Sequence, residues 1–168
     1  MPGTLVVGAS GALGPAAVEL ARTGRTVIAV GRSAQRLADL ACVQPRIRQV
    51  PTDYTDLQRL ADDLPPGPYE AALLHCPHAP LSARELLAER THGPVVELLT
   101  SAAADPGLVG ADLNLADLPT VGTVRVLLGW ADGPRWHTPN ELSQAALAAL
   151  ADGQDRILGR VRPWDERP

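Results

Sequence analysis

The sequence predicts an α/β domain in which helices cover both faces of a parallel β-sheet. Apolar segments with β-strand character alternate with helical patterns along the whole chain. These segments are short and almost continuously apolar, as is typical of strands that are buried on both faces. They are Thr4–Val7, Thr26–Val30, Ile47–Val50, Ala71–Leu74, Val95–Leu99 and Val124–Leu128, with a weaker seventh at Arg156–Val161. We therefore expect a single doubly wound domain over residues 1–168, with a sheet of about six or seven strands.

Helical patterns fill the intervals between these segments. They span Pro15–Arg22, Ala34–Ala41, Asp56–Leu64, Ala83–Arg90 and Pro139–Ala151. Three of them begin with the residue pair of a capping box, namely Thr55 with Gln58, Ser82 with Glu85, and Thr138 with Glu141. The interval from Ser101 to Gly122 has no clear helical pattern, and a segment of this kind is usually functional or a short irregular helix.

The composition excludes several classes of partner. The chain has 168 residues, a net charge of −4 and a pI of about 5.5, so no basic surface is expected to bind nucleic acid or anionic lipid. No apolar run approaches the roughly 18 residues of a membrane span, and the N-terminus lacks the pattern of a signal peptide. Cys42 and Cys76 lie on different expected elements, so we expect no disulfide and a cytoplasmic protein.

The chain contains no lysine, and all 15 of its basic residues are arginine. This absence excludes a Walker-type phosphate lysine, a Schiff-base lysine and a lysine that assists a catalytic tyrosine.

A glycine-rich loop follows the first predicted strand and leads directly into the first predicted helix. Its sequence is Gly8-Ala9-Ser10-Gly11-Ala12-Leu13-Gly14. In a dinucleotide-binding βαβ unit, the first glycine permits the tight turn, the second admits the pyrophosphate, and the third lets the helix pack near the sheet. The helix then presents free N–H groups and a partial positive charge to the phosphates. This context predicts that Gly8, Ser10, Gly11, Ala12, Leu13 and Gly14 bind a dinucleotide cofactor, although such a turn also occurs without a ligand.

The G-x-x-G-x-x-G spacing and the Val7-Gly8-Ala9-Ser10-Gly11 segment resemble the extended and atypical branches of the short-chain dehydrogenase/reductase family. The resemblance extends roughly from Thr4 to Ala151 and implies a Rossmann-like fold that binds NAD(P). An acidic residue after the second strand would bind the ribose of NAD, but this chain has Arg32 and Ser33 there. A guanidinium suits the 2′-phosphate of NADP, so the resemblance implies NADP, with NAD still open. Arg32 equally fits a solvated surface arginine.

The resemblance also implies cofactor-binding residues after the third and the fourth strand. Asp53 matches a residue that accepts a hydrogen bond from the adenine amino group, but it also fits an Asx turn or a helix N-cap. His75 or His78 follows the fourth strand and would face the pocket. With Cys76 they invite a metal interpretation, but the chain offers no diagnostic spacing of four zinc ligands, so we expect no metal.

The catalytic residues of the resembled family are only partly present. Ser101 matches the serine that orients the substrate. The family's tyrosine lies about a dozen residues further on, with a lysine four beyond it, and this chain has Asn114 and Leu118 at those positions. The standard Ser-Tyr-Lys mechanism is therefore absent.

The loop after the sixth strand matches the family's loop beside the nicotinamide. It carries Trp130, Arg135, Trp136 and His137. His137 would act as the acid or base, and Arg135 would bind an anionic substrate. In the alternative interpretation, this loop is packed and its tryptophans fill the core.

The sequence as a whole supports two hypotheses. The first is an NADP(H)-dependent oxidoreductase that acts on a small molecule with a non-standard proton donor, such as His137, Ser101 or water. The second is a non-catalytic NAD(P)-binding sensor or partner protein, which the missing tyrosine and lysine favour. Relatives are often dimers or tetramers, so the resemblance also allows a homo-oligomer.

Overall fold

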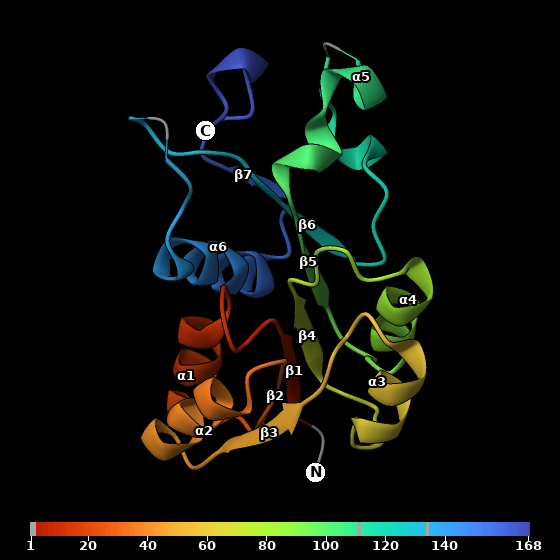
Figure 1. Ribbon diagram of the computed structural model, residues 1–168, viewed down its shortest axis with the longest axis vertical. Coiled ribbons are helices and arrows are strands. Elements are labelled where there is room, and N and C mark those ends of the chain that lie inside the picture. The colour runs from red at the N-terminus through yellow and green to blue at the C-terminus, as the bar shows by residue number, and fades with distance from the viewer. Residues whose placement is uncertain (1–2, 111, 134) are drawn as a thin grey trace.

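Seven parallel strands form one sheet at the centre of the molecule (Figure 1). The computed structural model describes residues 3–110, 112–133 and 135–168. The strand order is β3-β2-β1-β4-β5-β6-β7, so the chain builds one half of the sheet outward from β1 and then returns to build the other half from β4. The strands are β1 (Thr4–Val7), β2 (Val27–Gly31), β3 (Ile47–Pro51), β4 (Ala71–Leu74), β5 (Val95–Leu99), β6 (Val124–Leu128) and β7 (Arg156–Leu158). The predicted fold class is confirmed.

Helices cover the sheet on both faces (Figure 1). On one face, a core cluster joins α1 (Gly14–Arg22), α2 (Ala34–Val43) and α6 (Pro139–Asp152) to the strands. On the other face, a second cluster joins α3 (Leu57–Asp63) and α4 (Leu81–Glu89) to the strands. This double cover explains why the strand sequences are apolar at nearly every position.

Two of the three predicted capping boxes are wrong. Thr138 does cap α6, and its side chain and that of Glu141 form the expected reciprocal pair. The N-cap of α3 is Asp56 rather than Thr55, because the Asp56 carboxylate accepts from the amide of Arg59. Helix α4 begins after Pro80 without a side-chain cap, so Ser82 lies inside the helix. Both errors shift a helix start by one or two residues.

The interval without a predicted helix holds only short turns of helix. These are η1 (Ser101–Ala104), α5 (Pro106–Val109) and η2 (Leu115–Asp117). A third apolar cluster covers the sheet at this point, with Trp130 fully buried at its centre and Trp164 packed against it. The interpretation in which the tryptophans of the β6 loop fill the core therefore holds for Trp130 but is wrong for Trp136, which is 47% exposed.

The order in which strands are added to the sheet reverses between the neighbouring parallel strands β1 and β4. The loop after β1 contacts the loop after β4 so closely that a Cβ on Gly8 would lie 2.5 Å from the carbonyl oxygen of His75. Gly8 also has a φ of +90°, which side-chain-bearing residues rarely adopt. In open α/β sheets, ligands bind in the crevice at such a switch point.

Candidate functional site

Three cavities lie one after another along the carboxyl edge of the sheet. The first, of about 200 Å³, lies beside the glycine loop and includes Pro77 in its lining. The second, of about 250 Å³, shares Pro77 with the first and Thr100 with the third. The third, of about 230 Å³, lies between the ends of β5 and β6 and includes Thr100. Because neighbouring cavities share a wall residue, they lie side by side in a run from the end of β2 to the end of β6.

The glycine loop borders the first cavity with Gly8, Ser10, Gly11 and Ala12. A Cβ added to Gly11 would meet only the carbonyl oxygen of Gly8, at 3.9 Å, so the space beside Gly11 is open. In the part of the chain that the structure describes, the amides of Ser10 and Ala12 donate to no protein acceptor. Helix α1, which follows, has no side-chain cap at its N-terminus. The loop therefore has backbone donors to offer to an anion.

Leu13 and Gly14 play structural parts in this loop. The amide of Leu13 donates to the carbonyl oxygen of Gly8, and the Leu13 side chain is fully buried. Gly14 lies outside the first cavity, and a Cβ there would lie 2.9 Å from the carbonyl oxygen of Ala9. These two residues shape the turn, and neither lines the first cavity.

Two arginines line the first cavity from the end of β2 and the first turn of α2. Arg32 is exposed, and no acidic residue lines the cavity with it. Arg36 donates to the carbonyl oxygen of Ser10 at 3.3 Å, which holds its guanidinium over the glycine loop. Ser33 caps α2 by accepting from the amide of Arg36 and does not line the cavity. Arg32 was expected at this site from the sequence, whereas Arg36 was not.

Asp53 lies just beyond this cavity and forms an Asx turn. Its Oδ1 accepts from the amide of Thr55 at 3.0 Å and from the Thr55 hydroxyl at 2.8 Å. These two hydrogen bonds, chiefly the one from the amide, lower the pKa of the Asp53 carboxyl. The next residue, Tyr54, is the one that lines the cavity.

His75 closes the first cavity from the end of β4. Burial lowers the pKa of its imidazole, and its Nδ1 is buried without a protein partner. A neutral histidine with an unpaired buried nitrogen can bond a ligand hydroxyl here. His78, by contrast, lines the second cavity and has a φ of 68°.

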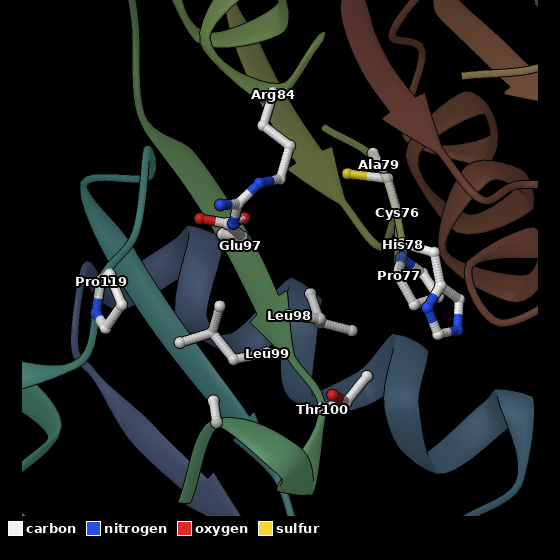
Figure 2. Close-up of a pocket in the computed structure, with 11 residues that line it drawn as sticks. Cys76, Pro77, His78, Ala79, Arg84, Glu97, Leu98, Leu99, Thr100 and Pro119 are labelled. Carbon is white, nitrogen blue, oxygen red and sulfur yellow. Dashed lines mark hydrogen bonds and ion pairs between the residues drawn. The ribbon is translucent and has the colours of Figure 1, made fainter. Parts of the chain in front are cut away.

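A buried ion pair dominates the second cavity. Figure 2 shows the Arg84 guanidinium of α4 directly against the Glu97 carboxylate of β5. Nη1 of Arg84 donates to Oε1 of Glu97 at 2.6 Å. Glu97 also accepts from the hydroxyl of Thr120 and, at 2.9 Å, from the amide of Val121. Burial, reinforced by the nearby Glu97, raises the pKa of the Cys76 thiol in the same cavity to about 12, so this thiol stays protonated. No periodic pattern in the sequence predicts this pair, because Glu97 lies within an otherwise apolar strand.

The third cavity brings Ser101 and His137 together. Ser101 is buried in η1, and the His137 side chain is only 7% exposed just before α6. The guanidinium of Arg167 also lines this cavity and donates through Nε to the Ser101 hydroxyl at 3.1 Å. Arg167 was not expected here from the sequence, because it lies 66 residues after Ser101 and carries no local motif.

His137 lies close to an acidic residue. Its Nδ1 is 3.6 Å from Oε2 of Glu141, one turn along the start of α6. Glu141 is itself held by two hydrogen bonds from Arg135, at 2.9 and 2.8 Å, and these strongly lower the pKa of the Glu141 carboxyl. Arg135 is therefore occupied by Glu141 and does not line the third cavity. A Cβ on Gly159 would lie 2.4 Å from Nε2 of His137, so the glycine makes room for the imidazole.

Comparison with solved structures identifies the fold. A short-chain dehydrogenase from Streptomyces avermitilis superposes with a TM-score of 0.66 at 16% identity, over 94% of this chain and 88% of the other. A 3-hydroxyacyl-CoA dehydrogenase type-2 from Mycobacterium avium gives 0.65 at 18% identity, over 93% and 94%. An oxidoreductase of the short-chain dehydrogenase/reductase family from Burkholderia thailandensis gives 0.61 at 18% identity, over 95% and 92%. The chain has the short-chain dehydrogenase/reductase fold. No protein-family model and no curated protein sequence matches it.

This chain departs from the short-chain dehydrogenase/reductase pattern at the positions expected for tyrosine and lysine. Asn114 caps η2 by accepting from the amide of Ala116, and Leu118 is buried in the third apolar cluster. Both side chains support the local fold, and neither can donate a proton to a substrate.

Within residues 3–110, 112–133 and 135–168, no group of three or more histidine, cysteine or acidic side chains could hold a metal ion. No helix among these residues is both long enough and apolar enough to span a membrane.

Proposed function

We propose that this protein is an NADP(H)-dependent oxidoreductase of the short-chain type that reduces a carbonyl compound without the usual tyrosine and lysine. The observation that carries the proposal is the meeting of Ser101 and His137 in one cavity. That cavity lies at one end of the run whose other end is the glycine loop. A dinucleotide that spans the run would place its nicotinamide near these two side chains.

The residues of the first cavity fit a dinucleotide. The open space beside Gly11 and the free amides of Ser10 and Ala12 suit the pyrophosphate. The unpaired Nδ1 of His75 suits a ribose hydroxyl. Nicotinamide, when bound, supplies or accepts a hydride.

A preference for NADP over NAD follows from the charges around the same cavity. Arg32 and Arg36 both line it, and no carboxylate does. Two guanidinium groups favour the 2′-phosphate of NADP, whereas recognition of an unmodified ribose uses an acidic residue.

In the third cavity, the protein's own groups can serve carbonyl reduction. The Ser101 hydroxyl can bond the carbonyl oxygen, and His137 can donate the proton that this oxygen needs once its carbon receives a hydride. The Glu141 carboxylate lies 3.6 Å from Nδ1 of the same imidazole. His137 thus takes the part that tyrosine plays in the standard mechanism.

Turnover with NADPH tests this function. The parent and the variants Ser101→Ala and His137→Gln are assayed against aldehydes, ketones, oxo acids and quinones. Loss of the general acid should lower the rate of carbonyl reduction by about 10²–10⁴-fold while NADPH binding is retained. Tight NADPH binding with no turnover of any substrate would instead support a non-catalytic nucleotide-binding protein. A rate that ignores both substitutions would remove these residues from the mechanism.

A further inference from the structure

The guanidinium of Arg167 lies at the wall of the third cavity with no acidic partner. Among the residues that the structure describes, no carboxylate lies within ion-pair distance of it, and its one side-chain hydrogen bond goes from Nε to Ser101. Its neighbours on the same segment are engaged. Arg160 pairs with Asp132 and Glu166, and Arg162 donates to backbone carbonyl oxygens.

Two aromatic rings hold this guanidinium in place. It lies 5.4 Å from the ring centre of Trp136 and 5.1 Å from that of Trp164. Such contacts are favourable and orient the planar group without neutralising its charge. Its Nη1 and Nη2 atoms therefore remain available as a pair of donors.

The cavity is lined by equal numbers of apolar and polar residues. The apolar ones are Leu128, Gly129, Trp136 and Leu142, and the polar ones are Thr100, Ser101, His137 and the exposed Arg167. An unpaired cation on the wall of a small cavity of mixed polarity, next to a hydroxyl and an imidazole, suits a small ligand that carries one negative charge.

We propose that Arg167 binds the carboxylate of the substrate and that the substrate class is 2-oxo acids. The Ser101 hydroxyl and the Arg167 Nε are 3.1 Å apart, so the two ligand groups that they bind must be neighbours. In a 2-oxo acid the carbonyl is bonded directly to the carboxylate, which meets this requirement. A bound reduced nicotinamide would supply the hydride to the carbonyl carbon, and His137 would supply the proton to the carbonyl oxygen. The products are the 2-hydroxy acid and the oxidised nicotinamide.

The choice of a carbonyl compound rests on the proposed oxidoreductase function, whereas the carboxylate site rests on Arg167 alone. The test therefore uses binding of oxamate, a 2-oxo acid analogue that is not reduced. Calorimetry measures oxamate binding to the parent, Arg167→Gln and Arg160→Gln, each with and without NADPH. Arg160→Gln is the matched control, because it removes a guanidinium of the same segment whose charge is already paired.

We expect oxamate to bind the parent and Arg160→Gln alike, and Arg167→Gln to bind about tenfold to a hundredfold more weakly. The neutral methyl ester of oxamic acid should bind the parent as weakly as oxamate binds Arg167→Gln. Absent oxamate binding, or equal binding to all three proteins, overturns the carboxylate site whether or not NADPH binds. Failure of NADPH to bind, with oxamate binding still dependent on Arg167, would overturn the proposed function and leave the carboxylate site standing.

Discussion

At the scale of single residues, the sequence reveals contacts between neighbours more readily than contacts between distant segments. Ser10, Gly11 and Ala12 could be grouped in one loop from the sequence because the glycine spacing fixes a local turn, and all three line the first cavity. The sequence alone does not decide whether Asp53 contacts adenine or forms an Asx turn. In the structure its carboxylate accepts two hydrogen bonds from Thr55 and forms the turn. The contact of Arg167 with Ser101 could not be predicted, because the two residues are far apart in the sequence.

One prediction at this scale concerns the choice of cofactor. Replacement of Arg32 by alanine removes a charge-assisted contact to the 2′-phosphate, worth about 1.5–3 kcal/mol. The dissociation constant for NADPH should rise about tenfold to a hundredfold, with little change for NADH. Fluorescence titration with both nucleotides measures this. Arg46→Ala is the control. Arg46 is also exposed, but it directly precedes β3 and so lies at the amino ends of the strands, away from the cavities. Equal losses for NADPH and NADH would exclude Arg32 as the phosphate ligand.

At the scale of elements, strand positions are predicted well and helix starts less well. Four of the expected strands, among them Thr4–Val7 and Val95–Leu99, have the observed bounds, because an apolar run ends where burial ends. Helix starts depend on which of several adjacent polar residues accepts the first free amide. Asp56 is better placed than Thr55 to accept the amide of Arg59, and the sequence alone does not separate them.

The helix caps give a prediction at this scale. Thr138→Ala removes the reciprocal cap of α6, and the free energy of unfolding should fall by about 1 kcal/mol. Ser82→Ala is the matched control, since Ser82 is exposed within α4 and makes no cap, so its effect should stay within about 0.5 kcal/mol. Urea denaturation of both variants measures the difference. A larger loss for Ser82→Ala than for Thr138→Ala would contradict the observed caps.

At the scale of the whole molecule, the fold follows from the sequence and the site only in part. Alternation of apolar strands and helices predicts the doubly wound sheet, and the glycine loop locates its switch point. The run of cavities along the carboxyl edge could not be predicted from the sequence, because it depends on how β4, β5 and β6 align their ends in space. The covering of the sheet after Ser101 by Trp130 and Trp164 also arises from tertiary packing between distant segments.

The central claim is that this edge of the sheet binds NADP(H). The most direct measurement is parallel calorimetric titration of the parent and Gly11→Val with NADPH, NADP, NADH and NAD. A Cβ at Gly11 meets nothing closer than 3.9 Å, so the variant should fold while its side chain fills the place of the pyrophosphate. We predict that NADPH and NADP bind the parent at one site, more tightly than NADH and NAD, and that Gly11→Val loses this binding. Absence of binding to the parent, or equal NADPH affinity in a folded Gly11→Val, would contradict the account.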